Sequence, residues 1–337
     1  MGTNTTKVLV ETIVRRTLRE IQSAPERNIR NLVDMALNFS KGRFQKRFFE
    51  STQRMLSNEH SAYYQLVRSI ANNVDHERLI RFGMNVGYNS CTLGARKIRE
   101  IEAAEGFNIP WALHLEINAD LLMQRRDAYH ALICQGKELG IYTWFVYVDR
   151  LCMELFELLA GHDDCAFALL CDGHALNEEM LGELERLKHV LISVALDDDA
   201  DVICTDLLNR KLLYAVHKTY TSDDLKDILS DNMLYDTQCF SAPFTALIPD
   251  AHCSASEREL VYDYVLRKRQ AQEFPTIMWD MIRDVLAIDT IVSDDCCSAG
   301  FHADGTFFSL ASGQNVEQWN LFSNDLRTIL ANSFPKQ

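Results

Sequence analysis

The stretch that decides the fold runs from Phe107 to Gly173, beginning FNIPWALHLEI and ending CAFALLCDG. Three short apolar runs alternate there with two longer segments of helical periodicity. The apolar runs are Ala112 to Ile117, Ile141 to Val148 and Cys165 to Cys171, and the helical segments are Leu121 to Leu139 and Leu151 to Leu159. This alternation is typical of β-α-β units and predicts an α/β fold with a parallel sheet. We therefore expect functional residues in the loops at the carboxyl ends of the strands.

The alternation continues beyond Gly173, whereas the first 78 residues show only helical periodicity. About six or seven strands are expected in all. Five local predictions are a strand at Val190 to Leu196, a helix N-cap at Ser222 or Asp223, a capping box from Ser256 to Glu259, a strand at Ile288 to Val292 and a helix at Val316 to Leu330. These assignments predict an amino-terminal helical region followed by an α/β domain.

Composition narrows the class of protein. The chain has 337 residues, of which 47% are hydrophobic, and no apolar run approaches the ~18 residues of a membrane span. A net charge of −14 argues against nucleic acid as the main partner. The ten cysteines and the absence of a secretory signal predict reduced thiols in the cytoplasm.

A series of short phrases in collinear order resembles the radical S-adenosylmethionine superfamily, and most of all a bacterial, SPASM-like subgroup. The phrases are Pro25 to Ile29, Asn108 to Trp111, Gln135 to Tyr142, His162 to Cys165, Asp172-Gly173, Leu176 to Glu179, Cys297 to Gly300 and Ala303 to Gly305. The resemblance implies a partial parallel (β/α)6-type barrel over residues 79–310. A helical region, 1–78, would precede it, and a helical tail, 311–337, would follow.

The resemblance also implies a [4Fe–4S] cluster held by a C-x3-C-x2-C loop after the first strand, and this chain lacks that motif. Three thiolates are needed because one loop must bind three irons, while the fourth iron binds S-adenosylmethionine. The segment after the first predicted strand, Asn118 to Arg126, contains no cysteine, and the ten cysteines form no such triplet elsewhere. We therefore expect no [4Fe–4S] cluster.

Other cofactor-binding elements of the family are altered as well, which makes binding of S-adenosylmethionine doubtful. The Gly-Gly-Glu segment expected after the second strand is replaced by Asp149-Arg150, and Ala195 replaces the carboxylate expected on the fourth strand. Ser193, together with Asp172 and Gly173, still fits the family pattern. These three residues are the remaining candidates for cofactor binding.

Two kinds of chemistry stay open for the strand ends. Glu116, Asp149 and Asp172 are candidate acid–base groups at the barrel mouth, where His114 shares one strand face with Glu116. Zinc sites are not expected, because neither Cys296-Cys297 with His302 nor His252-Cys253 has the paired spacing of structural zinc ligands.

The favoured hypothesis is a catalytically degenerate radical-S-adenosylmethionine-like protein that acts as a binding, regulatory or partner subunit. Its ligand would be another protein or a small molecule in the barrel mouth. The alternative is an enzyme that has repurposed the mouth carboxylates for acid–base chemistry on a small molecule.

Overall fold

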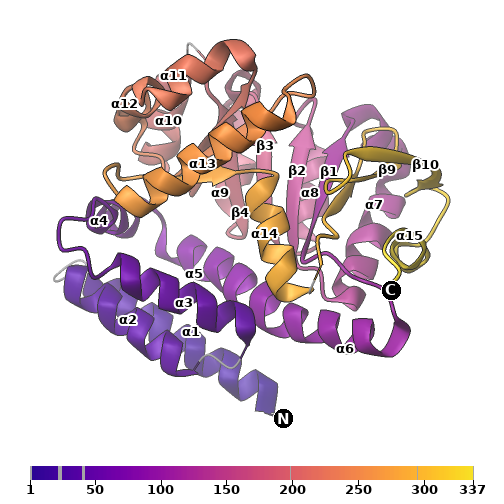
Figure 1. The fold of residues 1–337 in the computed structure, drawn as a ribbon, viewed down its shortest axis with the longest axis horizontal. Helices are drawn as coiled ribbons and strands as arrows, with labels where there is room; N and C mark the ends of the chain where they lie inside the picture. Colours follow the sequence, from indigo (N-terminus) through magenta and orange to yellow (C-terminus); the bar gives the residue numbers. More distant parts are fainter. Residues whose placement is uncertain (1, 22–24, 40–41, 198, 294, 337) are drawn as a thin grey trace. The chain divides into compact units, whose positions relative to one another are not determined.

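The computed structural model describes residues 2–21, 25–39, 42–197, 199–293 and 295–336. The chain divides into two compact units, which we call unit 1 (Met1–Lys41, Gln45–Ile80 and Ser193–Asp284) and unit 2 (Gly42–Phe44, Arg81–Ile192 and Val285–Gln337). Figure 1 traces the elements of both units along the chain. A search of the described helices finds none with the length and apolarity that a bilayer crossing requires.

The strands of unit 2 surround β1, the strand from Ala112–Ile117. β1 pairs in parallel with β2 (Thr143–Val148) on one side and with β8 (Ala299–Phe301) on the other. The remaining strands are β3 (Ala166–Cys171), parallel to β2, and the antiparallel pair β9 (Thr306–Ser309) and β10 (Gln314–Asn320). The register of β1 and β2 places Glu116 beside Tyr147. The carboxyl ends of β1, β2 and β3 therefore lie at one edge, where the functional loops were expected.

The helices of unit 2 precede, connect and follow these strands. They are α6 (Ala95–Glu105), α7 (Ala119–Leu139), α8 (Met153–Ala160), α9 (Glu178–Arg186) and α15 (Leu326–Ser333), together with a π-helix at Asn85–Gly94 and a 3-10 turn at Gly173–Ala175. α7 contacts α8 and α15. Its Gly136 lies against Trp144 of β2, so closely that an added Cβ would come within 2.6 Å of the Trp144 ring. This close approach fixes how α7 packs on the strand.

Unit 1 combines the amino-terminal helices with later α/β elements. The helices α1 (Gly2–Ile21), α2 (Pro25–Phe39) and α4 (Tyr63–Asn73) contact one another, and α3 (Arg43–Met55) precedes α4 (Figure 1). The later elements are α10 (Ala200–Asn209), β5 (Tyr214–Tyr220), α11 (Leu225–Leu229), α12 (Asn232–Thr237), β6 (Phe244–Pro249), α13 (Ala255–Ala271) and β7 (Ile277–Asp280). β6 is parallel to both β5 and β7. Their core includes buried Tyr220, Leu247 and Tyr264.

Four elements have residues in both units: α3, α5 (His76–Met84), β4 (Val190–Ala195) and α14 (Arg283–Val292). The predicted α/β class, with mostly parallel strands and a helical amino-terminal region, is confirmed. The predicted strand at Val190 to Leu196 is confirmed as β4 to within one residue.

Several local predictions are wrong. The segment Ile288 to Val292 is the end of helix α14 and not a strand, because its apolar residues pack from a helix. The segment Val316 to Leu330 begins in strand β10, and its helix starts only at Leu326. The α13 capping box uses Ser254 and Glu257, two residues before the predicted pair.

The turn before α11 also differs from its prediction. Thr221 is the N-cap there, and its capping box is completed by Asp224, whose carboxylate accepts hydrogen bonds from the Thr221 amide and hydroxyl. Ser222 and Asp223, the predicted caps, lie inside the 3-10 turn Ser222–Asp224. Ser, Thr and Asp all favour N-caps, so their intrinsic preference could not choose among adjacent positions.

Candidate functional site

The site expected from the sequence lies at the carboxyl end of β1, and a single residue connects this strand to the next helix. β1 ends at Ile117 and α7 begins at Ala119, so that Asn118 alone lies between them. Asn118 has an extended backbone, and its side chain accepts a hydrogen bond of 3.0 Å from the Leu121 amide. Asn118 is therefore the N-cap of α7 and belongs to no extended loop.

Asp149, at the end of β2, reinforces this junction. One of its carboxylate oxygens accepts a hydrogen bond of 3.0 Å from the Ala119 amide, and the other accepts a bond of 2.6 Å from the Asn118 side chain. A carboxylate at the amino terminus of a helix is also favoured by the helix dipole. The structure thus places this predicted acid–base candidate in contact with the backbone of α7.

Glu116 has a different partner, one that is remote in the sequence. Its carboxylate lies 3.0 Å from Nδ1 of His302, which directly follows β8. The two side chains keep 41% and 34% of their surface exposed, and the His302 ring stacks on Phe308 at a centroid distance of 4.4 Å. A carboxylate beside a partly exposed imidazole is an arrangement that can accept and return a proton.

His114 lies two residues before Glu116, on the same face of β1, and is buried. Its ring stacks on Phe145 and Tyr147, and its Nδ1 lies 3.3 Å from the Tyr147 hydroxyl. Burial lowers the pKa of His114 to about 3 and raises the pKa of Tyr147. Both groups are therefore neutral near pH 7, and they form a neutral layer below the Glu116–His302 pair.

The remaining candidates occupy separate local settings. Asp172 is exposed and caps the turn Gly173–Ala175 by accepting a hydrogen bond of 2.9 Å from the His174 amide, while Gly173 is buried. Ser193, which belongs to unit 1, is buried and lies 3.0 Å from Nδ1 of His217. Among the described residues, no hydrogen bond or ion pair joins the carboxylates of Glu116, Asp149 and Asp172 to one another.

The cysteine and histidine pairs considered for zinc have other neighbours. Cys297 is buried with its sulfur 3.3 Å from the Ser293 hydroxyl, and His302 faces Glu116. Cys253 is buried and lies 3.3 Å from the Tyr220 carbonyl, while His252 is exposed. In the described part of the chain, no three cysteine sulfurs lie within 4.8 Å of one another.

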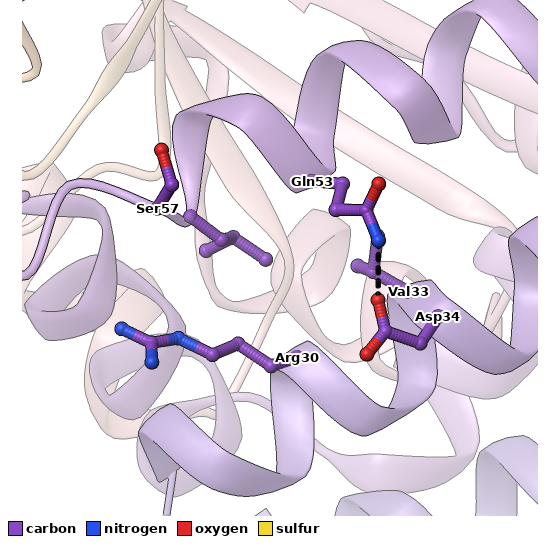
Figure 2. A pocket seen from close by; sticks show the side chains of 6 residues that line it. Arg30, Val33, Asp34, Gln53 and Ser57 are labelled. Atoms are coloured by element: carbon purple, nitrogen blue, oxygen red, sulfur yellow. Dashed lines mark hydrogen bonds between the residues drawn. The ribbon is translucent and has the colours of Figure 1, made fainter.

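A separate hollow lies between α2 and α3 of unit 1. It has a volume of about 230 Å³ and is lined by Arg30, Val33, Asp34, Gln53, Leu56 and Ser57. Figure 2 shows the bond of 2.7 Å from the Gln53 amide to Asp34 across this hollow. The volume is below the 300–1,000 Å³ that is usual for small-molecule sites.

Comparison with known proteins gives a likeness in fold. The structure of Streptococcus suis SuiB bound to precursor peptide SuiA has a TM-score of 0.52 and 10% identity, over 70% of this chain and 67% of that one. SuiB bound to S-adenosylmethionine gives 0.52 and 8%, over 70% and 66%, and SuiB alone gives 0.51 and 10%, over 89% and 78%. The chain has the fold of a radical S-adenosylmethionine enzyme. The sequence matches no protein-family model and no curated protein.

The residues at the mouth of this radical S-adenosylmethionine fold do not fit an iron–sulfur cluster. A cluster of this type needs three thiolates from the loop after the first strand. After β1, Asn118 leads into a helical turn that is interrupted at Arg125, whose backbone is non-helical (φ −128°, ψ 27°), before the rest of α7, and residues 118–126 contain no cysteine. The chain therefore lacks, at this position, the three thiolates that the cluster requires.

Sequence reasoning identified Glu116 and His302 separately but did not pair them, because 186 positions separate them and only the sheet register joins them. It also missed a group formed by His130, Cys134 and His162. The spacing of His130 and Cys134, four residues apart within a predicted helix, was the one signal that could have suggested it.

Proposed function

We propose that this chain is a catalytically degenerate relative of the radical S-adenosylmethionine enzymes that serves as a binding or regulatory partner. The observation that carries the proposal is that residues 118–126, which follow β1 where the family's cluster loop lies, contain no cysteine. The contacts of Asn118 and Asp149 support it, because they fix the start of α7 directly after β1.

Loss of the cluster also argues against cofactor binding of the family's type. S-adenosylmethionine would bind through the fourth iron, which cannot be present without the thiolates. The turn after β2 is short as well, since β2 ends at Val148 and α8 begins at Met153. We therefore propose that S-adenosylmethionine is not a cofactor of this chain, although one SuiB structure contains it.

We propose a peptide or protein segment as the partner. SuiB, with which this chain shares its fold, has been solved with a precursor peptide bound. The net charge of −14 makes nucleic acid an unfavourable partner.

A reducing, cytoplasmic setting suits the ten cysteines, all of which are free thiols in the structure.

Anaerobic reconstitution with iron and sulfide tests the absence of the cluster. We expect the purified chain to retain far fewer than the roughly four irons and four sulfides of a cubane, and to show no cluster signal by electron paramagnetic resonance after reduction. SuiB treated in parallel serves as the positive control.

The variant Cys239→Ser serves as a control for iron that binds nonspecifically to accessible thiols, because Cys239 is exposed and lies outside the mouth. If the iron content of the reconstituted protein falls in this variant, the iron that is lost was bound nonspecifically. A stoichiometric cubane that survives the substitution would refute the proposal, and so would reductive cleavage of S-adenosylmethionine by the reconstituted chain.

One observation favours the alternative function, an acid–base enzyme. The Glu116–His302 pair is partly exposed and is not used to cap a helix, whereas Asp149 and Asp172 both are bonded to backbone amides. Under this alternative, a small molecule retained by the native protein in mass spectrometry would be lost from Glu116→Gln and from His302→Gln. The exposed control Glu317→Gln would keep it. Equal retention by all variants would exclude this pair as the site.

A further inference from the structure

Three potential metal ligands meet in unit 2 at a place that the proposed function does not use. His130 and Cys134 lie one helical turn apart on α7, and His162 lies in the connection between α8 and β3. Their ligand atoms all lie within 4.8 Å of one another. Nε2 of His130 is 3.7 Å from the Cys134 sulfur, and the two imidazole rings have a centroid distance of 4.5 Å.

His162 supplies an independent reason to expect a ligand. Only 1% of its surface is exposed, and both of its ring nitrogens lack a hydrogen-bond partner among the described residues. Buried polar atoms are almost always satisfied by protein, water or an ion, because an unpaired one loses its hydration without compensation. A species bound between His162 and α7 would satisfy a nitrogen that the fold leaves unpaired.

The backbone holds His162 in this position. The turn is fixed by hydrogen bonds from the His162 amide to the Leu159 carbonyl at 3.0 Å and from the Cys165 amide to the His162 carbonyl at 2.9 Å. Nearby, Lys137 of α7 forms an ion pair with Asp164 at 3.1 Å. This pair connects the same helix to the same turn, so the three ligands are arranged before any ion binds.

We propose that His130, Cys134 and His162 form a transition-metal site, best suited to Zn²⁺, with one coordination position open to water. Zinc binds thiolate at about 2.3 Å and imidazole at about 2.0–2.1 Å, so tetrahedral geometry places the two ligand atoms about 3.6 Å apart. The sulfur-to-nitrogen distance of 3.7 Å agrees with this value. Three protein ligands with an open position are the pattern of a reactive zinc site.

This site is independent of the barrel mouth. His162 precedes β3, so the site lies toward the amino end of that strand, whereas Glu116 and Asp149 lie at the carboxyl ends of β1 and β2. It uses one thiolate and two imidazoles, a donor set that suits zinc and does not build an iron–sulfur cluster. Its failure or success therefore leaves the proposed function untouched.

The test is titration of the metal-free full-length protein with Zn²⁺ against a chromophoric chelator, followed by Co²⁺ substitution. We expect one tight equivalent of Zn²⁺, tetrahedral ligand-field bands with Co²⁺, and a sulfur-to-cobalt charge-transfer band. In Cys134→Ser the charge-transfer band disappears. Loss of an outer-shell partner typically lowers metal affinity by roughly 10- to 100-fold. Because Cys134→Ser and His162→Gln each remove a direct ligand, we expect the Zn²⁺ affinity to fall by more than this in both variants.

Matched controls are Cys239→Ser and His252→Gln, which replace an exposed cysteine and an exposed histidine of unit 1 and should leave affinity and spectra unchanged. Because His162 is buried and its variant could unfold, His130→Gln provides a second test at an exposed ligand. Circular dichroism of each variant verifies folding. The proposal is overturned if the native chain binds no Zn²⁺ tightly, or if folded Cys134→Ser and His130→Gln bind it as tightly as the native chain.

Discussion

Asp289 shows how burial sets the properties of a single residue in this fold. It is fully buried, and it accepts hydrogen bonds from the Trp111 amide at 3.0 Å and from the Ser298 hydroxyl. Burial raises the pKa of its carboxyl to about 7, although the hydrogen bonds from Ser298 and Trp111 oppose the shift. Through these two hydrogen bonds, Asp289 of α14 is bonded to Trp111, which precedes β1, and to Ser298, which precedes β8.

This shift predicts a pH dependence of stability. Between the ordinary aspartate pKa of about 4 and the folded value of about 7, the unfolded chain has lost the proton that the folded chain retains. The free energy of unfolding should then fall as the pH rises through this window, by at most about 1.4 kcal/mol per pH unit. Asp289→Asn removes that contribution, so its urea-unfolding free energy should fall less steeply between about pH 5 and about pH 7.

Asp127→Asn is the matched control, because Asp127 is exposed on α7. Its pH profile should run parallel to that of the native chain. Identical slopes for Asp289→Asn and the native chain would show that Asp289 is ionised in the folded state.

The residues of the candidate site could be predicted only in part. Glu116 and Asp149 were recognised because each lies at the end of an apolar run, which position in the sequence reveals. Their partners were not recognised, because Glu116 meets His302 through the pairing of β1 with β8, and Asp149 after β2 meets the start of α7 through the pairing of β1 with β2. Contacts of this kind depend on strand order, which local periodicity does not contain.

At the scale of elements, the packing of α7 on β2 gives a second prediction. In Gly136→Ala the new methyl group would lie 2.6 Å from the ring of buried Trp144. Overpacking of this kind costs about 1–3 kcal/mol, and the gain of about 1 kcal/mol from replacing a helical glycine offsets only part of it. Urea unfolding should therefore show a net loss of stability.

Gly182→Ala provides the opposite case on α9. Apart from its chain neighbours and the backbone of its own helix, no atom lies within 4 Å of the position that its Cβ would take, so only the helix-propensity gain of up to about 1 kcal/mol remains. The two alanine variants should thus shift the unfolding midpoint in opposite directions. Equal stabilisation by both would mean that Trp144 moves aside freely.

The elements also show where sequence periodicity succeeds. β1 was predicted with its observed bounds, and α7 to within two residues at its start, because a buried parallel strand and a long amphipathic helix have distinct patterns. The end of α14 and β10 were assigned wrongly. Ile288–Val292 has three apolar residues among five, and so short a pattern fits either a strand or the end of a helix, so that only packing decides between the two.

At the scale of the whole molecule, the cysteines give a prediction about thiol chemistry. Among the ten, Cys239 is exposed, Cys134 and Cys296 are half-buried, and the others are buried. Burial raises the pKa of Cys91 and of Cys171 to about 12, which makes these thiols poor nucleophiles. A thiol-specific chromogenic reagent should therefore modify no more than three cysteines rapidly in the native protein, and all ten after denaturation.

Mass spectrometry of alkylated peptides identifies which cysteines react. Rapid modification of Cys91 or Cys171 would show that the native core opens on the timescale of the reaction. Fewer than ten reactive thiols in denaturant would indicate a disulfide or another modification.

The direct passage from strand to helix at Asn118 has a consequence for protein engineering. Grafting cysteines at positions 118, 122 and 125 would copy the spacing of the family's motif, yet it would remove the Asn118 side chain that accepts a hydrogen bond from the Leu121 amide and caps α7. Leu122 is fully buried, so a cysteine thiol in its place would point into the core. Point substitution at these positions is therefore not expected to create a cluster site.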